Sequence, residues 1–166
     1  MSSLTLEQLL ASRDARAAHQ KELLGLYPGC SLVCLTVQLP GPEKRNALSQ
    51  AIACAGVEAV RKAYLPVHEE LRDLPTGFEG YFLVGLPPVE AKRRACEIEA
   101  SHPLGRLMDI DVPGVGREEI GLAPRRCLLC DNEVRYCMRA KTHTQEELLQ
   151  KMNQMVNEYE QGIQTA

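Results

Sequence analysis

The chain has no tryptophan and only two phenylalanines, and aromatic residues make up 4% of its 166 residues. Proteins that bind single-stranded nucleic acid stack its bases on aromatic side chains and follow its backbone with an excess of positive charge. The formal net charge here is -3, so that excess is missing too. Together these two shortages predict that nucleic acid is not a partner of this protein.

Long apolar runs are also missing. The two longest, within residues 30–39 and 80–89, are about half of the roughly 20 residues that a membrane-spanning helix requires. We therefore expect no membrane segment and interpret both runs as buried strands. The amino-terminal segment carries charged side chains where a signal peptide needs an uninterrupted apolar region, so we expect a cytoplasmic protein.

The cysteines do not suggest a disulfide framework. There are seven of them, an odd number. Four lie in apolar segments where a thiol behaves as a small hydrophobic side chain, and these are Cys30, Cys34, Cys54 and Cys96. Because the length fits one domain and no internal repeat or linker divides the chain, we expect a single domain over residues 1–166 with reduced cysteines.

Helical and strand patterns alternate along the chain. Apolar residues recur at helical intervals in residues 6–26, 43–64 and 144–162, and a fourth segment, residues 89–100, is charged and rich in helix-favouring residues. The first and last of the four along the chain begin with capping boxes, which are Thr5 with Gln8 and Thr144 with Glu147. Strand-forming residues fill two segments, 30–39 and 80–86. This order predicts an α/β (α+β) fold, with a mixed sheet flanked by helices and a C-terminal helix.

One further segment, residues 105–112, alternates as a strand with two different faces. Its aliphatic residues share the face expected to pack inward, and these are Met108, Ile110 and Val112. Leu107, Asp109 and Asp111 share the other face, and the Cα atoms of the two aspartates are roughly 6 to 7 Å apart, close enough to hold magnesium together on a phosphorylated substrate. The alternative is the solvated face of an edge strand, but aspartate is depleted in strands, so two of them favour a functional reason.

Residues next to the acidic pair are of types that can bind a phosphate group. Gly105 would let a phosphate approach the backbone, and Arg106 would supply a planar donor to its oxygens. His19, His68 and His102 each lack a partner in the sequence, and His102 is the one of interest because it stands just before this turn.

A cluster of cysteine and histidine follows, with the spacing C-x2-C-x6-C-x5-H. Its members are Cys127, Cys130, Cys137 and His143. Four such ligands satisfy tetrahedral zinc and leave no position for substrate, so a zinc ion here would be structural. The alternative is a pair of core thiols in a tight turn, because two leucines separate the first two cysteines.

The same region is rich in positive charge. Five basic residues lie between Gly121 and His143, and these are Arg125, Arg126, Arg135, Arg139 and Lys141. Such a patch could receive a triphosphate or an acidic protein, and the alternative is a solvated basic loop.

Several of these segments together resemble one family. They are SHPLGRLMDIDV at 101–112, PRRCLLC at 124–130, Cys137, Arg139, KTH at 141–143, LLASRDARAAHQ at 9–20 and PGPEK at 40–44. They resemble the holo-citrate-lyase synthase family, the apo-citrate lyase phosphoribosyl-dephospho-CoA transferases, over nearly the whole chain.

The resemblance implies that a serine hydroxyl of the acyl carrier subunit of citrate lyase attacks triphosphoribosyl-dephospho-CoA and that pyrophosphate leaves. It also implies a nucleotidyltransferase-like fold, because the related carrier-activating enzymes of malonate decarboxylase resemble nucleotidyltransferases with a metal-binding Asp-x-Asp. The expected catalytic residues are Asp109, Asp111, Arg106 and His102, with the two aspartates on magnesium. The expected substrate-binding residues are Gly105, Arg117, Arg125 and Arg126. For the general base, a metal-bound carboxylate, His102 and solvent are all left open.

Two features depart from the family pattern. Met108 stands where an aromatic residue is usual, and the loop after Asp111 is short, with Gly116 and Arg117 in place of a Ser-Arg pair. Two alternative functions follow from the residues and the resemblance. One is the same transfer to the malonate decarboxylase carrier protein, and the other is a non-catalytic zinc-binding interaction module.

Overall fold

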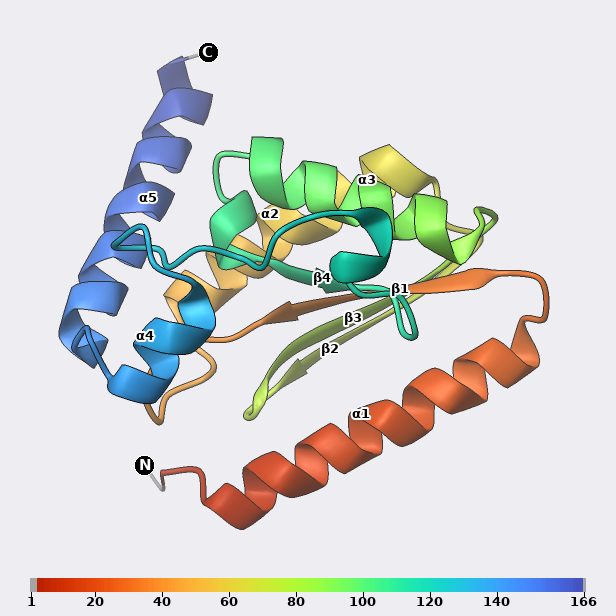
Figure 1. Ribbon diagram of the computed structural model, residues 1–166, viewed down its shortest axis with the longest axis horizontal. Coiled ribbons are helices and arrows are strands. Elements are labelled where there is room, and N and C mark those ends of the chain that lie inside the picture. The colour runs from red at the N-terminus through yellow and green to blue at the C-terminus, as the bar shows by residue number, and fades with distance from the viewer. Residues whose placement is uncertain (1–2, 166) are drawn as a thin grey trace.

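The computed structural model describes residues 3–165, which form five α-helices and a sheet of four strands (Figure 1). The helices are α1 (Leu6–Leu26), α2 (Ala47–Tyr64), α3 (Pro88–Ser101), α4 (Val134–Ala140) and α5 (Gln145–Thr165). The strands are β1 (Ser31–Val37), β2 (His68–Leu74), β3 (Gly77–Val84) and β4 (Asp109–Asp111). Two short 3-10 helices, η1 (Gly105–Leu107) and η2 (Glu118–Ile120), flank β4. The predicted α/β (α+β) class with a C-terminal helix is confirmed.

The strands pair in the order β2-β3-β1-β4, and each neighbouring pair is antiparallel, so this sheet is antiparallel and not mixed as expected. All seven residues of β1 are buried, which fits its central position and its nearly continuous run of apolar side chains. At one edge of the sheet, β4 pairs with β1 over only three residues.

The two faces of the sheet are covered differently. Helices α2 and α3 lie on one face, and α1 crosses the other face alone (Figure 1). The larger core lies on the α2 and α3 side, where Leu35, Ile52 and Ile110 are fully buried. Under α1 the apolar cluster is small and centres on Leu23 and Tyr81. Much of the sheet face under α1 is therefore polar.

The helix boundaries follow from capping. The predicted boxes at Thr5 with Gln8 and at Thr144 with Glu147 are both present. The second helix was expected from residue 43 but begins at Ala47, because Asn46 caps it and exchanges hydrogen bonds with Ser49. None of the helices within residues 3–165 is long and apolar enough to cross a membrane.

Two expectations about strands need correction. Strand β2 was not predicted, because its sequence HEELRDL is polar, as suits the exposed edge of the sheet. The segment 105–112 is not one strand: it starts as η1 and becomes a strand only at Asp109. Leu107 is consequently buried rather than sharing a polar face with the aspartates.

Candidate active site

The two aspartates project from β4 toward the face that α1 covers. Asp109 pairs with Thr36 of β1 and Asp111 with Cys34, and residues directly opposite each other in a sheet point to the same side. Ile110 between them points to the core and is fully buried. The predicted division of this segment into an acidic and an aliphatic face therefore holds over the three residues of β4.

The outer edge of β4 is held by two charged side chains of α3. Lys92 and Glu99 are seven residues apart, about two helical turns, and only 4% and 6% exposed. Glu99 accepts the backbone N–H of Ile110 at 3.1 Å, and the Lys92 ammonium donates to the Ile110 carbonyl at 3.4 Å and to Asp111 Oδ1 at 3.0 Å. These contacts satisfy backbone groups that have no further strand to pair with. They fix the strand that carries the acidic pair.

Glu99 also lies close to two of the predicted arginines. Its two carboxylate oxygens lie 3.5 Å from Arg117 Nη1 and 3.4 Å from Arg125 Nη1. Burial raises the pKa of Glu99, and the positive charge of Arg125 and the hydrogen bond from Ile110 oppose that shift. A buried carboxylate with two cationic neighbours and a backbone donor is a structural anchor for the whole edge.

The predicted arginines also donate hydrogen bonds to backbone carbonyls. Arg106 donates to the carbonyls of Arg126 and Cys127 at 3.0 and 2.7 Å, and Arg125 returns a hydrogen bond to the Arg106 carbonyl at 3.0 Å. Arg126 is exposed, and its guanidinium donates to the Asp131 carbonyl. Three predicted arginines thus lie together around Glu99 and η1, and Arg126 faces solvent beside them.

The side-chain carboxylate of Asp109 has no partner among the residues that the structure describes. Within residues 3–165, neither a hydrogen-bond donor nor a cation lies within bonding distance of its carboxylate, although the side chain is half-buried. Burial, and after it the negative charge of Asp111, raises the pKa of Asp109, while Arg125, Lys92 and Arg16 oppose the shift. A partly buried carboxylate without a partner is a functional candidate, and carboxylate oxygens are the ligands that magnesium prefers.

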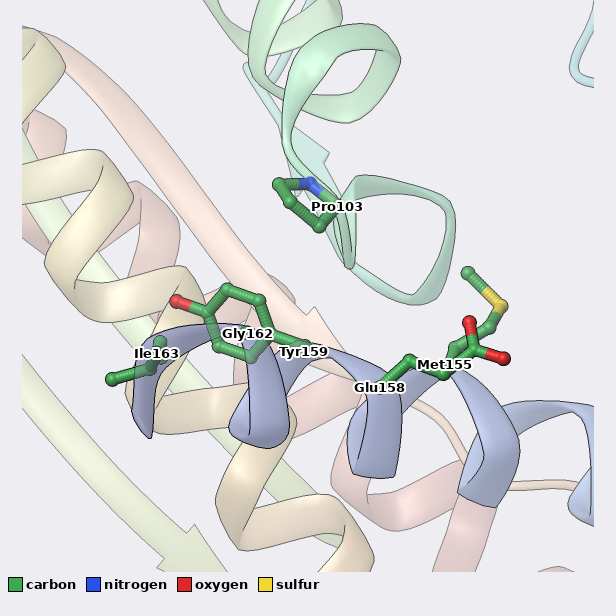
Figure 2. A pocket seen from close by; sticks show the side chains of 6 residues that line it. All are labelled: Pro103, Met155, Glu158, Tyr159, Gly162 and Ile163. Carbon is green, nitrogen blue, oxygen red and sulfur yellow. The ribbon is translucent and has the colours of Figure 1, made fainter. Parts of the chain in front are cut away.

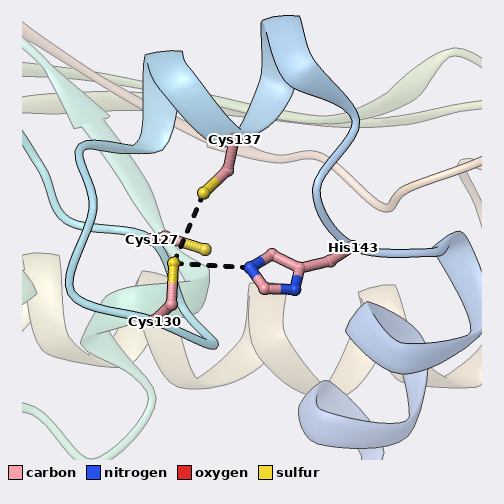
Figure 3. A group of neighbouring side chains, drawn as sticks. All are labelled: Cys127, Cys130, Cys137 and His143. Carbon is pink, nitrogen blue, oxygen red and sulfur yellow. Dashed lines mark hydrogen bonds between the residues drawn. The ribbon is translucent and has the colours of Figure 1, made fainter.

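The predicted metal cluster is assembled (Figure 3). Cys127 and Cys130 come from the loop before α4, Cys137 from α4 and His143 from the segment after it, and their ligand atoms all lie within 4.8 Å of one another. The Cys130 sulfur is 3.4 Å from both the Cys137 sulfur and His143 Nε2. The hydrogen bond with His143 lowers the pKa of the Cys130 thiol to about 6. Three thiols and one imidazole converging in this way form a Cys3His group that could bind a metal such as zinc.

His102 is not brought to the aspartates. Its ring lies 5.4 Å from that of Tyr159 in α5 and lines a hollow with α2 residues such as Glu58, on the opposite side of the sheet. Its Nδ1 accepts the backbone N–H of Leu104 at 2.9 Å, and burial lowers the pKa of the ring. The structure therefore places His102 at the end of α3 and away from Asp109, and its catalytic role stays a prediction.

Gly105 is buried against the end of α3. A Cβ at this position would lie 2.4 Å from the Glu99 carbonyl oxygen and 2.5 Å from that of Ile98. Close packing against backbone explains why glycine stands here, and the suggested approach of a phosphate stays a prediction.

Another hollow, of about 520 Å³, lies between α5 and the turn after α3 (Figure 2). Pro103 faces Tyr159 and Glu158 across it, with Met155 and Ile163 toward its two ends. None of its lining residues belongs to β4 or to the arginine-rich segment, so it is separate from the acidic pair.

Sequence reasoning missed Lys92, Glu99 and Arg16. All three were included in predicted helices without a role. One signal was available for two of them: Lys92 and Glu99 share the α3 face of the buried residues Ala91, Ala95 and Ile98, where a charged side chain requires a partner.

An α/β protein that gathers two carboxylates and three arginines at one sheet edge has the groups needed to handle a phosphorylated substrate. Residues 4–159 match the family described as apo-citrate lyase phosphoribosyl-dephospho-CoA transferase. A probable apo-citrate lyase phosphoribosyl-dephospho-CoA transferase of Vibrio cholerae serotype O1 (strain M66-2) is 36% identical over 168 residues, covering 95% of this chain and 94% of that protein. The apo-citrate lyase phosphoribosyl-dephospho-CoA transferase of Escherichia coli O1:K1 / APEC is 37% identical over 166 residues, covering 94% of this chain and 90% of that protein. The chain therefore belongs to this family of transferases, as its motifs indicated.

Proposed function

We propose that this protein transfers the phosphoribosyl-dephospho-CoA group from triphosphoribosyl-dephospho-CoA to a serine of the citrate lyase acyl carrier subunit. The observation that carries the proposal is the family match over residues 4–159, which spans every element that forms the site. We propose further that the whole chain acts as one transferase domain. Its seven free cysteines suit a reducing, cytoplasmic setting.

In the proposed reaction the serine oxygen forms a bond to the phosphorus nearest the ribose. The bond from that phosphorus to the bridging oxygen breaks, and pyrophosphate leaves with the electron pair. Asp109 and Asp111 would hold magnesium, which neutralises negative charge on the phosphates when bound. The chain's own task is to position donor and serine, since phosphoryl transfer depends mostly on placement and charge.

The serine proton must be taken up as the new bond forms. Of the three candidates for the base, His102 lies on the other side of the sheet. We propose an oxygen of Asp109, because this carboxylate lies within the site and makes no hydrogen bond to any group of residues 3–165. Water is the alternative acceptor.

We propose that zinc binds the Cys3His group and has a structural role. Four protein ligands complete a tetrahedron and leave no open position for substrate. Elemental analysis of protein purified without chelator should find about one zinc per chain, and less than about a tenth of an equivalent would refute a site of this tight-binding kind.

The transfer itself has a direct test. Purified protein, apo carrier subunit of citrate lyase, triphosphoribosyl-dephospho-CoA and magnesium should yield a carrier whose intact mass rises by one prosthetic group. A rise only with the malonate decarboxylase carrier would instead support that acceptor. Zinc and carrier binding with no mass change on either carrier would support a non-catalytic interaction module.

A further inference from the structure

Helix α1 presents an unusually polar stripe to the sheet. The residues of α1 that are less exposed than their neighbours recur at helical spacing, and these are Leu9, Ser12, Arg16, His19, Gln20 and Leu23. Only Leu23 is fully buried. A helix that covers a sheet for stability alone normally turns an apolar stripe toward it. Stability alone therefore does not explain the polar residues in the middle of this stripe.

The sheet surface beneath that stripe is the one that carries the acidic pair. Asp109, Thr36 and Glu79 are aligned across β4, β1 and β3 by the strand register. Glu79 Oε1 lies 3.8 Å from Arg16 Nε, while Glu79 Oε2 accepts the hydroxyl of Tyr81 at 2.5 Å. Arg16 thus stands over the row of residues that begins at Asp109.

Arg16 differs from the other arginines near the acidic pair because its donors make no hydrogen bond to any group in the described part of the chain. Arg106, Arg117 and Arg125 each donate to backbone carbonyls or lie against Glu99. For Arg16, the one polar contact within residues 3–165 is the 3.8 Å approach to Glu79, which is too long for a hydrogen bond. A guanidinium carries five N–H donors, and its side chain here is 20% exposed, so it can accept a new anionic partner without breaking an existing hydrogen bond.

We infer that Arg16 binds the phosphate oxygens of the donor and that α1 forms the wall of the donor site opposite Asp109. This inference rests on the proposed function, because it names the residue of α1 that receives the substrate of that reaction. The fork of an arginine matches two oxygens of a phosphate, and Arg16 lies at the Glu79 end of the row that crosses β1 to Asp109, one of the proposed magnesium ligands. The donor's triphosphate would then lie between a metal on the strand and a guanidinium on the helix.

The test compares Arg16→Ala with Lys21→Ala, which removes the same charge from an exposed position of the same helix. Binding of inorganic tripolyphosphate with magnesium is measured by calorimetry, and the donor KM by the mass-transfer assay. Losing a charge-assisted contact should weaken tripolyphosphate binding roughly tenfold or more and raise the donor KM by a similar factor. The Lys21 variant should match the wild type in both.

Tripolyphosphate binding requires neither carrier nor transfer, so it judges Arg16 independently of the proposed reaction. Wild-type protein that binds tripolyphosphate without modifying a carrier would overturn the proposed function alone. Undiminished binding by Arg16→Ala, an equal loss in Lys21→Ala, or no binding by the wild type would overturn the role of Arg16. If Arg16→Ala does not fold, Arg16→Lys decides the matter, because it keeps charge and stem but loses the fork: weaker binding supports the inference and wild-type binding overturns it.

Discussion

Replacing Asp109 by asparagine should abolish transfer and at the same time stabilise the fold. The asparagine keeps the shape of the side chain but loses the charge that magnesium requires. Because no protein group pairs with the Asp109 carboxylate among residues 3–165, the substitution breaks no ion pair. It also removes the repulsion from Asp111, the second cause of the raised pKa of Asp109 after burial.

The size of the gain can be bounded from the geometry. With the two carboxylates taken to be as far apart as their Cα atoms, roughly 6 to 7 Å, they repel by about 0.6 to 2.8 kcal/mol as the effective dielectric constant falls from about 80 to 20. Attraction to nearby arginines offsets part of this repulsion, so we expect Asp109→Asn to gain about 1 kcal/mol at neutral pH. In a chain of this size that raises the melting temperature by about 2 to 4 °C.

The pH dependence has a definite sign. The folded pKa of Asp109 is raised, so the folded state holds its proton at pH values where the unfolded chain has lost it. Wild-type stability therefore falls as pH rises from about 3.8, the ordinary value, through the raised folded pKa. The asparagine variant lacks this loss, so its advantage should be complete at neutral pH and shrink as pH approaches 3.8.

Asp111→Asn should behave differently in stability. Asp111 Oδ1 lies 3.0 Å from the ammonium of Lys92, whose side chain is 5% exposed, and the substitution replaces the charged partner of this buried ammonium by a neutral amide oxygen. Because the Asp111 side chain is itself 67% exposed, solvent screens this ion pair, and we expect the free energy of unfolding to fall by only about 1 kcal/mol. The melting temperature should then fall by about 2 to 4 °C.

Thermal unfolding and the mass-transfer assay at limiting magnesium check both variants, with exposed Asp14→Asn as the control. A lowered melting temperature for Asp109→Asn would refute the repulsion argument. Near-normal transfer by either site variant would refute the metal role.

Three further predictions follow from contacts at the same edge. Gly105→Ala should cost at least about 2 kcal/mol in chemical denaturation, because the added carbon meets backbone carbonyls that cannot turn aside. Arg125→Ala should raise the donor KM more than Arg126→Ala does, because only Arg125 is anchored on Glu99; equal effects would favour a solvated loop or carrier docking. Cys130→Ser should lower the melting temperature by more than about 4 °C with little change in kcat of the folded fraction, and a chelator should destabilise the wild type but not this variant.

Local signals in the sequence predicted most of the fold. Both capping boxes and the apolar run of β1 depend on residues close together in the chain, and each was placed within a few residues. Strand β2 escaped notice because an exposed edge strand needs little apolar pattern. The start of α2 was placed too early because the helical spacing of its apolar residues does not show where the cap lies.

The candidate site was harder to predict because its support comes from distant residues. The alternation around Asp109 and Asp111 is local, and so is the cysteine spacing. The contacts of Lys92 and Glu99 with β4 depend on how α3 packs beside the sheet edge, which no spacing in the sequence specifies. His102 shows the reverse case: it is close to Gly105 in sequence but turns to the opposite side of the sheet.

The metal cluster and the acidic edge share one segment of chain. Cys127 contributes a ligand to the cluster, and its carbonyl accepts a hydrogen bond from Arg106 in η1, immediately before β4. Arg125, two residues earlier, lies against Glu99, which holds the Ile110 backbone between the two aspartates. Arg125, Arg126 and Cys127 are successive residues, with Arg125 held against Glu99 at one end and Cys127 held in the cluster at the other. A metal bound to the cluster would therefore also restrict the movement of Arg125. For this reason a structural ion at the cluster would influence donor binding without touching the donor.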